Sequence, residues 1–402
     1  MRRIAAAVIP VALACAGVAA PAAMASGTPT TQLISRALGG GLPNGPSTNA
    51  VISGDKRYAR VIAFQSDASN LVKGDTDGQT DVFAVIRSGA NNRGTPWRGR
   101  ATRLISRTRS GAPANGPSYA PAVGGGFHSR PTCVAFLSAA SNLVPGDTNG
   151  KVDAFISRGP GRKPTRLALP RHRQSDADAT GVAVSGNCSR IAWVAGGELY
   201  VRAKNRTRHV RVLGAAADPS FSSGFGNDLV FGARRGVYLS RGGTARPRLI
   251  ARGGRNPAYN DIKRHAVAYE VRRRGVTQIA YKDLGKRAHI ISARRGHLGN
   301  GASQHPVIGN SGYYVTFQTE ATNLGVTAGG ATGDANGRPD IYLYTNVRDI
   351  TLAESVKTKG IPAGAQNPSM SFYANYIVFD SAAMTGSLAN PRQIYMRYLG
   401  GL

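Results

Sequence analysis

The sequence predicts an all-β fold made of seven copies of one short unit, and three observations support this prediction. Glycine and proline are frequent, with 51 Gly and 22 Pro among 402 residues, which favours short strands and turns over long helices. Similar apolar stretches recur along almost the whole chain, and 41% hydrophobic residues can supply a large core. Only 18% of the residues are charged, so the chain is not a disordered polyelectrolyte.

Each unit begins with two short strands joined by a turn rich in Gly, Asn and Ser, and the second strand ends in an aromatic residue. The first strands are expected at residues 50–53, 121–124, 182–185, 219–222, 257–260, 306–309 and 368–371. The second strands are expected at residues 61–64, 134–136, 191–193, 229–231, 267–269, 315–317 and 377–379. This order of strand, turn and strand is typical of antiparallel sheets.

A third and a fourth strand complete the unit. The third strands are expected at residues 81–83, 153–155, 198–200, 236–238, 278–280, 340–342 and 393–395. The fourth strands are expected at residues 102–105, 165–168, 209–212, 247–250, 288–291 and 350–353. The C-terminal unit lacks a fourth strand, and residues 31–35 supply the missing pattern from the other end of the chain.

Such an exchange closes a ring and removes the open end that a linear array of sheets would have to cap. The repeat therefore predicts a β-propeller of seven blades, each of four antiparallel strands, with the N-terminal strand closing the last blade. Six blades are the alternative. A β-sandwich with the same number of strands would not explain the seven-fold register.

Residues 1–25 have the pattern of a secretion signal. Two arginines precede an apolar, Ala-rich run, and Ala23-Met24-Ala25 offers a small-x-small cleavage pattern before Ser26. An uncleaved membrane anchor is the alternative, because the run is nearly long enough to span a bilayer. We expect residues 26–402 to form a single propeller domain that has no transmembrane segment after cleavage. It is expected to be secreted, extracellular or associated with the cell envelope.

Two stretches carry a resemblance to a known family. Residues 69–78 read SNLVKGDTDG and residues 141–150 read SNLVPGDTNG, and both lie within the strand repeats given above. With these repeats the chain resembles the TolB-like, PD40 (WD40-like) propeller family over residues 31–399. The resemblance implies an exported propeller used for binding. TolB has six blades and an extra α/β domain, so seven repeats without that domain do not imply a TolB-specific role.

Blades 1, 2 and 6 share an acidic formula at the start of the third strand. It places Asp, Asp or Asn, Gly, and Asp at relative positions 0, 2, 3 and 6, which offers the hard oxygen ligands that Ca²⁺ prefers. The candidate ligands are Asp75, Asp77 and Asp81; Asp147, Asn149 and Asp153; and Asp334, Asn336 and Asp340. The same residues suit an Asx turn with a left-handed Gly, and we favour that interpretation because two copies lose a carboxylate to Asn.

The same three blades have an Asn-Gly-(Pro/Ala)-Ser loop before the first strand, at residues 44–47, 115–118 and 300–303. In an up-and-down blade this loop and the loop between the second and third strands lie at the same end, so both elaborations share one face. We interpret the Asn-Gly loops as turns that pack on the neighbouring insert and not as ligand contacts.

Two cysteines remain after the predicted signal, Cys133 and Cys188, each near the second strand of consecutive blades. In an exported chain, two cysteines favour a disulfide over a metal site, and two thiols are too few for a zinc cage. Their offsets from the two strands differ, so the sequence leaves the bridge open.

Positive charge is concentrated in the middle of the chain. The whole sequence has a formal charge of +30, and residues 159–297 contain 28 Lys and Arg against 8 Asp and Glu. Arginine suits bidentate contact with phosphate or carboxylate, so this sector predicts contact with an anionic envelope polymer or a protein partner, and export disfavours nucleic acid. The candidate residues are Arg206, Arg208, Arg211 and, at a predicted hairpin tip, Arg272, Arg273 and Arg274. A genomic enrichment in Arg that serves solubility explains the charge equally well.

The sequence offers no catalytic motif. No zincin, P-loop or dinucleotide-binding pattern occurs, and the acidic residues lie mostly in the turn formulae. We therefore favour a non-enzymatic binding or scaffold module of the bacterial cell envelope, with Ca²⁺ as its one candidate cofactor. The alternative is a propeller enzyme, a lyase or hydrolase with an axial active site. Convergent His, Tyr and carboxylate side chains at the axis would indicate the enzyme, and apolar and Gly residues the binding module.

Overall fold

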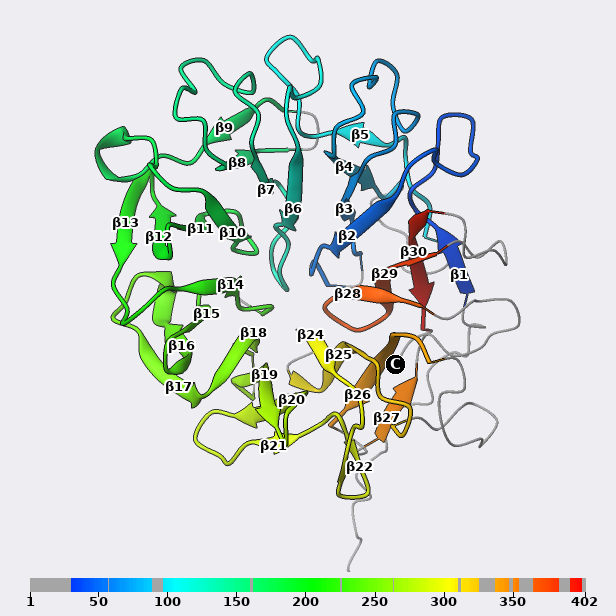
Figure 1. Cartoon of the computed structure of the whole chain (residues 1–402), viewed down its shortest axis with the longest axis vertical. Coiled ribbons are helices and arrows are strands. Elements are labelled where there is room, and N and C mark those ends of the chain that lie inside the picture. The colour runs from blue at the N-terminus through cyan, green and yellow to red at the C-terminus, as the bar shows by residue number, and fades with distance from the viewer. Residues whose placement is uncertain are drawn as a thin grey trace, which may run out of the picture.

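Seven four-stranded antiparallel sheets form a closed ring in the computed structural model (Figure 1). The structure describes residues 30–56, 58–88, 97–159, 162–224, 226–262, 264–309, 312–324, 337–346, 350–353, 364–382 and 391–399. The predicted signal, residues 1–25, lies outside the described residues. Within those ranges, no helix has the length and apolar character needed to cross a membrane. The seven-bladed, all-β prediction is confirmed, and the six-blade alternative is wrong.

The first strand of each blade lies next to the axis of the ring, and the second strand pairs with it on the outside (Figure 1). The first strands are β2 (Ser47–Ile52), β6 (Ser118–Val123), β10 (Ala179–Val184), β14 (Ala217–Phe221), β18 (Gly254–Asn260), β24 (Ser303–Gly309) and β28 (Gln366–Met370). The second strands are β3 (Val61–Ser66), β7 (Val134–Ser138), β11 (Arg190–Ala195), β15 (Leu229–Ala233), β19 (Ala266–Arg273), β25 (Tyr314–Thr319) and β29 (Tyr376–Ala382).

The third and fourth strands complete each blade toward the rim. The third strands are β4 (Asp81–Ile86), β8 (Asp153–Ser157), β12 (Glu198–Ala203), β16 (Gly236–Ser240), β20 (Val276–Asp283), β26 (Asp340–Thr345) and β30 (Arg392–Tyr398). The fourth strands are β5 (Arg103–Leu104), β9 (Pro164–Arg166), β13 (Arg206–Val210), β17 (Arg248–Arg252), β21 (His289–Ile290), β27 (Ile350–Ala353) and β1 (Thr30–Leu33). The connections that the structure describes include a small hairpin, β22 (Ala293–Arg294) with β23 (His297–Leu298), and the 3-10 turns η1 (Pro170–His172) and η2 (Arg241–Gly243).

The N-terminal strand closes the ring. β1 pairs antiparallel with β30, so that Thr31 lies opposite Arg397 and Leu33 lies opposite Tyr395. Just beyond β1, the buried Ser35 hydroxyl donates to Gln393 Oε1 at 2.8 Å and accepts from the Ile394 N–H at 2.9 Å. The predicted pairing of residues 31–35 with the last blade is confirmed.

The core consists of apolar layers between neighbouring blades. In blade 2, Phe136 in the middle of the second strand stacks on Phe155 of the third strand, with ring centroids 5.6 Å apart. Both rings are fully buried and share one apolar cluster with Val61, Ala63 and Val82 of blade 1. Because this sheet is covered on both faces, its middle strands β7 and β8 are buried along their whole length, which explains their nearly continuous apolar sequences.

Every first strand contains an irregularity that the repeat pattern did not predict. The register between the first and second strands shifts in all seven blades, and in six of them a non-glycine residue at this point has a positive φ. These residues are Asn49, Ala120, Asp218, Asn256, His305 and Asn367. Such a bulge turns an N–H out of the ladder.

A side chain of the preceding blade accepts this N–H at several blade junctions. Gln65 Oε1 accepts from the N–H of Ala120 at 3.0 Å, and Glu270 Oε1 accepts from that of His305 at 3.0 Å. In both of these pairs the acceptor follows the aromatic residue of the second strand, whereas Asp218 of a first strand accepts from the N–H of Asn256 at 3.3 Å. These bonds hold neighbouring blades in register where no strand pairing joins them.

The loops between second and third strands are long in blades 1, 2 and 6 and only two residues long in blades 3, 4 and 5. We call the end of the ring that carries these loops the insert face. Asn115 Nδ2 donates to Ser141 Oγ of the blade 2 insert at 3.0 Å, and the equivalent loops of blades 1 and 6 make the same bond. A Cβ on Gly301 would lie 2.5 Å from the Glu320 carbonyl carbon, so the loop requires Gly there. The prediction that the Asn-Gly loops pack on the inserts is confirmed.

Candidate functional site

The acidic formulae fold as Asx turns. In blade 1, Asp77 Oδ1 accepts from the N–H of Gln79 at 3.1 Å, and Gly78 has a φ of 67°. In blade 2, Asn149 Oδ1 accepts from the N–H of Lys151 at 3.2 Å. The predicted turn is therefore confirmed in both blades, and it leaves the other oxygens of the formula available for a second role.

In blade 1 the turn gathers three carboxylates. Asp75, Asp77 and Asp81 each place one carboxylate oxygen within 4.8 Å of the other two. Burial, and then the charge of Asp77, raises the pKa of Asp75 to about 6. Burial raises the pKa of Asp81 to about 8, against the lowering effect of a hydrogen bond from Ser106. The cluster therefore resists carrying its full negative charge unless a cation is present.

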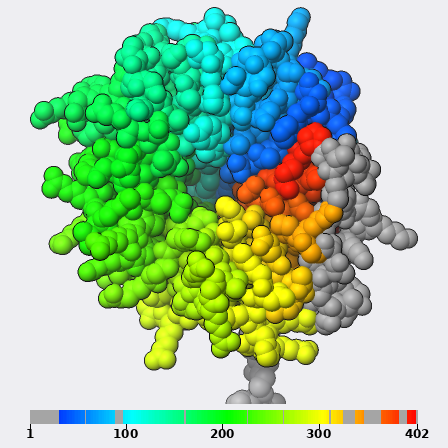
Figure 2. Space-filling view, in the orientation of Figure 1, coloured from blue at the N-terminus to red at the C-terminus, as the bar shows by residue number. Residues whose placement is uncertain are grey.

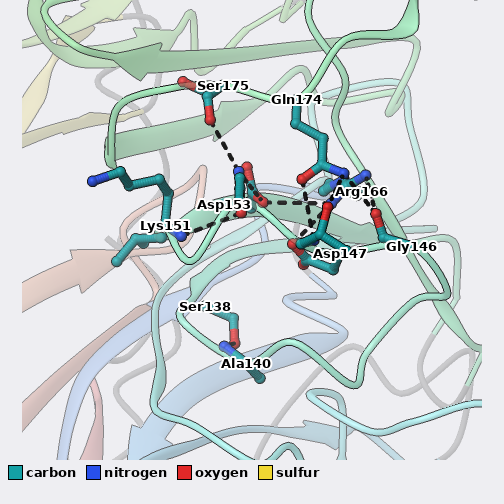
Figure 3. Close-up of polar contacts among 12 residues, drawn as sticks. Ser138, Ala140, Gly146, Asp147, Lys151, Asp153, Arg166, Gln174 and Ser175 are labelled. Atoms are coloured by element: carbon teal, nitrogen blue, oxygen red, sulfur yellow. Dashed lines mark hydrogen bonds and ion pairs between the residues drawn. The ribbon is translucent and has the colours of Figure 1, made fainter.

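In blade 2 a basic side chain lies between the matching carboxylates (Figure 3). Arg166 Nη1 contacts Asp147 Oδ1 at 2.9 Å and Asp153 Oδ2 at 3.7 Å. Asn149 turns its amide nitrogen, a donor, toward Asp153 Oδ2 at 3.0 Å. A guanidinium and an amide thus take up the carboxylate oxygens that a metal ion would need in this blade.

The third copy of the formula is described only in part. Asp334 and Asn336 lie outside the described residues, while Asp340 is buried at the start of β26 with 1% of its surface exposed. Cys133 and Cys188 form a disulfide between blades 2 and 3, with their Cα atoms 6.0 Å apart. The sulfur pair fixes the turns between first and second strands in these two blades.

A groove of about 770 Å³ opens at the rim of blade 3. It lies at the end opposite the insert face, because the β12–β13 turn and the loops between second and third strands lie at opposite ends of a blade. Its walls come from blades 2, 3 and 4. The basic side chains that line it are Arg158, Arg190, Arg202, Lys204, Arg206 and Arg208, and no acidic residue is among the described residues of its wall.

Four of these cations, Arg202, Lys204, Arg206 and Arg208, have neither a hydrogen-bond nor an ion-pair partner in the part of the chain that the structure describes. Arg206 and Arg208 lie two positions apart on β13, so their side chains leave the strand on the same side. Since β13 is the outer strand of its sheet, both side chains are exposed at the rim.

The other two cations are held by neutral groups. Arg158 Nη1 donates to the Cys188 carbonyl at 3.2 Å, and Arg190 Nη1 donates to Asn227 Oδ1 at 2.6 Å. Burial, and then the positive charge of Arg158, lowers the pKa of Arg202 below its usual value. The groove thus concentrates positive charge that the described residues around it do not neutralise, and a bound anion would relieve this repulsion.

The structure separates the six arginines that the sequence singled out. Arg206 and Arg208 line the groove, and Arg211 follows β13 outside the groove lining. Arg272, Arg273 and Arg274 form the predicted hairpin tip between β19 and β20, which lies on the insert face of blade 5. Sequence reasoning missed Arg158, Arg190, Arg202 and Lys204. Only the closed ring brings Arg158 to the groove from blade 2, whereas the other three belong to blade 3 itself, and the nearness of Arg202 and Lys204 to Arg206 in the sequence was a usable signal.

The axis of the ring holds a small cavity of about 160 Å³ (the hollow at the centre of Figure 2). Its lining consists mainly of apolar, Gly and Ser residues such as Ile52, Gly125, Val184 and Met370. Tyr259 is the one titratable side chain among the lining residues that the structure describes, and burial raises its pKa to about 12. This volume is below the range of about 300–1,000 Å³ that small-molecule sites occupy.

Comparisons with known proteins define the class of the fold. No model of a protein family matches the sequence, and no curated protein matches it. The β-propeller domain of Cps50 (Swd1) from Myceliophteria thermophila aligns with a TM-score of 0.50 at 11% identity, over 92% of this chain and 100% of that domain. A puromycin-hydrolyzing peptidase from Mycobacterium tuberculosis aligns with a TM-score of 0.50 at 11% identity, over 84% of this chain and 50% of that protein. A TolB structure from Agrobacterium tumefaciens gives a TM-score of 0.41 at 11% identity, over 74% of this chain and 94% of that one.

At these identities the likeness establishes a β-propeller and nothing about activity. The chain spans half of the peptidase and the whole of the Swd1 domain. Function must therefore be argued from the side chains that this propeller presents.

Proposed function

We propose that the protein is an exported binding propeller of the bacterial cell envelope, similar to the TolB-like PD40 propellers, that holds an anionic polymer in the blade 3 groove. The observation that carries this proposal is the set of four cations in the groove without a partner among the described residues. Natural surfaces usually intersperse both signs of charge, so a wall of one sign indicates a ligand of the opposite sign.

The chemistry of the wall favours phosphate or carboxylate groups. Guanidinium groups are planar forks that bind such anions through two parallel hydrogen bonds, whereas an ammonium is a point charge. Arg206 and Arg208 are separated by two residues of strand, about 6.5–7 Å. An extended polymer that carries one charge per repeat can meet both side chains in succession.

The axial lining supports a binding role over axial chemistry, and two other features support the exported location. The axial cavity presents apolar, Gly and Ser residues, which is the lining expected of a binding module. The pattern of the first 25 residues and the Cys133–Cys188 disulfide both suit an oxidising, exported location. A protein partner with an acidic surface is the second candidate ligand, and the groove would contact it through the same side chains.

The test compares two variants that each remove three exposed positive charges. The groove variant carries Lys204→Asn, Arg206→Ala and Arg208→Ala. The tip variant carries Arg272→Ala, Arg273→Ala and Arg274→Asn. Asn replaces Lys204 and Arg274 because both have a positive φ, 48° in each case, which Asn tolerates.

Binding of labelled poly(glycerol phosphate) is measured by fluorescence anisotropy at 50 and 300 mM NaCl, with chelator present. We expect the groove variant to lose at least tenfold in affinity at low salt and to show a flatter dependence on salt, because fewer counterions are released. The tip variant should bind within about twofold of the wild type. Equal weakening in both variants would mean that net charge alone drives binding and would reject the groove, as would wild-type protein that binds no polyanion at 50 mM NaCl.

A further inference from the structure

Among the residues that the structure describes, no cation pairs with the blade 1 acidic turn, whereas Arg166 pairs with its copy in blade 2. Asp75 is 3% exposed, and its side chain makes no hydrogen bond or ion pair within the described ranges. Asp81 is fully buried, its Oδ1 accepts from the Ser106 hydroxyl, and its Oδ2 is buried without a hydrogen-bond partner. Buried carboxylates without compensation are costly, so this arrangement favours a bound cation, which no residue in the described part of the chain supplies.

In blade 2 a positive side chain compensates the matching buried carboxylates. The carboxylates that match Asp75 and Asp81 are Asp147 and Asp153, and the Arg166 guanidinium contacts both (Figure 3). In blade 1, register places Leu104 at the position of Arg166, since Leu104 pairs with Phe83 as Arg166 pairs with Phe155. A leucine cannot neutralise a carboxylate. The position that holds positive charge in blade 2 is therefore apolar in blade 1.

We infer that blade 1 binds one Ca²⁺ ion through Asp75, Asp77 and Asp81, and that Arg166 takes the place of this ion in blade 2. The three carboxylate oxygens lie within 4.8 Å of one another, and two ligands of one Ca²⁺ ion at 2.3–2.6 Å can be at most about 5 Å apart. Asp77 is exposed, so the ion has access from solvent, and water can complete the coordination. The Asx turn made by Asp77 Oδ1 leaves Asp77 Oδ2 for the metal.

The experiment uses the chain from Ser26 onward and titrates it with CaCl2 by isothermal titration calorimetry. We expect about one bound ion per chain in the wild type and loss of binding in Asp75→Asn and in Asp81→Asn. Asp153→Asn is the matched control in blade 2, and it should bind one ion as the wild type does. MgCl2 should compete weakly, because Mg²⁺ requires shorter, near-octahedral contacts.

Thermal melting separates lost binding from lost folding. In chelator, Asp81→Asn should melt no lower than the wild type, because the variant buries a neutral amide in place of a carboxyl group. In 1 mM CaCl2 it should melt lower than the wild type, because only the wild type is stabilised by the bound ion. Equal wild-type melting in chelator and in CaCl2 would overturn the site, as would undiminished binding in both blade 1 variants. Equal affinity for MgCl2 would overturn the assignment to calcium. Because polymer binding is measured in chelator, failure of either proposal leaves the other intact.

Discussion

Closure of the ring depends on a hydroxyl group that can be removed without changing the backbone. Ser35 binds two groups of β30, Gln393 Oε1 and the Ile394 N–H, and its side chain is fully buried. In Ser35→Ala both groups lose their partner. Gln393 cannot turn away to find another, because its Nε2 donates to the Gly45 carbonyl at 2.9 Å.

The expected cost follows from these contacts. A buried polar group left without a partner costs about 1–3 kcal/mol, and the lower part of this range, about 1–2 kcal/mol for each group, gives roughly 2–4 kcal/mol for the two together. For a chain of this length that corresponds to a fall in Tm of about 3–5 °C. If this free energy is lost from the local equilibrium in which β1 separates from β30, the population of molecules with β1 detached should rise between about 30-fold and nearly 1000-fold. Limited trypsin digestion measures this opening as cleavage after Arg36, read by mass spectrometry.

Blade 5 offers a control with the same chemistry. Ser292 donates to Gln278 Oε1 at 2.6 Å and accepts from the Ile279 N–H at 2.8 Å, and Gln278 Nε2 donates to the Gly299 carbonyl at 2.9 Å. Ser292→Ala should lower Tm by a similar amount without speeding cleavage after Arg36, which is exposed but lies just after the paired strand β1. Digestion after Arg36 that is no faster in Ser35→Ala than in Ser292→Ala would refute closure through this bond.

Two further substitutions test the disulfide and the charge of blade 2. The double variant Cys133→Ala, Cys188→Ala should lower the free energy of unfolding by up to about 4 kcal/mol, because the disulfide closes a loop of 55 residues and so restricts the unfolded chain. Calorimetry should show a lower Tm for this variant than for the oxidised wild type. Arg166→Gln should lower the free energy of unfolding by roughly 3 kcal/mol in chelator, because Asp147 and Asp153 lose their positive partner. Added CaCl2 should restore part of the lost Tm. An unchanged Tm in chelator would contradict the ion pair.

The repeat made the architecture predictable because every blade solves the same packing problem with similar residues. The stretch at 31–35 matches 102–106, so the place of β1 followed from pattern alone. The bulges were not predictable in this way. The bulge residues include Asn49, Ala120 and His305, which share no side-chain chemistry, since the feature depends on an N–H and a backbone angle. A signal did exist in the polar residue after the aromatic, such as Gln65, but its partner belongs to the next blade.

The two candidate sites also differ in how far the local sequence could predict them. The acidic turn is local, with Asp75, Asp77 and Asp81 within seven residues, so sequence identified its members. Whether those carboxylates are compensated depends on the fourth strand of the same blade, and the difference between Leu104 and Arg166 emerges only from strand register. The groove lies at the other extreme, because its wall joins residues from three blades.

The centre of the ring explains why binding is better placed at the rim. The turn of blade 2 that follows β6 reaches across the axis. Its Phe127 N–H donates to the Gly224 carbonyl of blade 4 at 3.2 Å, and the centroid of the Phe127 ring lies 5.1 Å from that of Phe372 in blade 7. The Cys133–Cys188 disulfide ties this turn to blade 3. Side chains that fill the axis in this way are committed to holding four blades together. The exposed side of the edge strand β13 does not pack against another blade, so its arginines can bind a ligand without weakening the core.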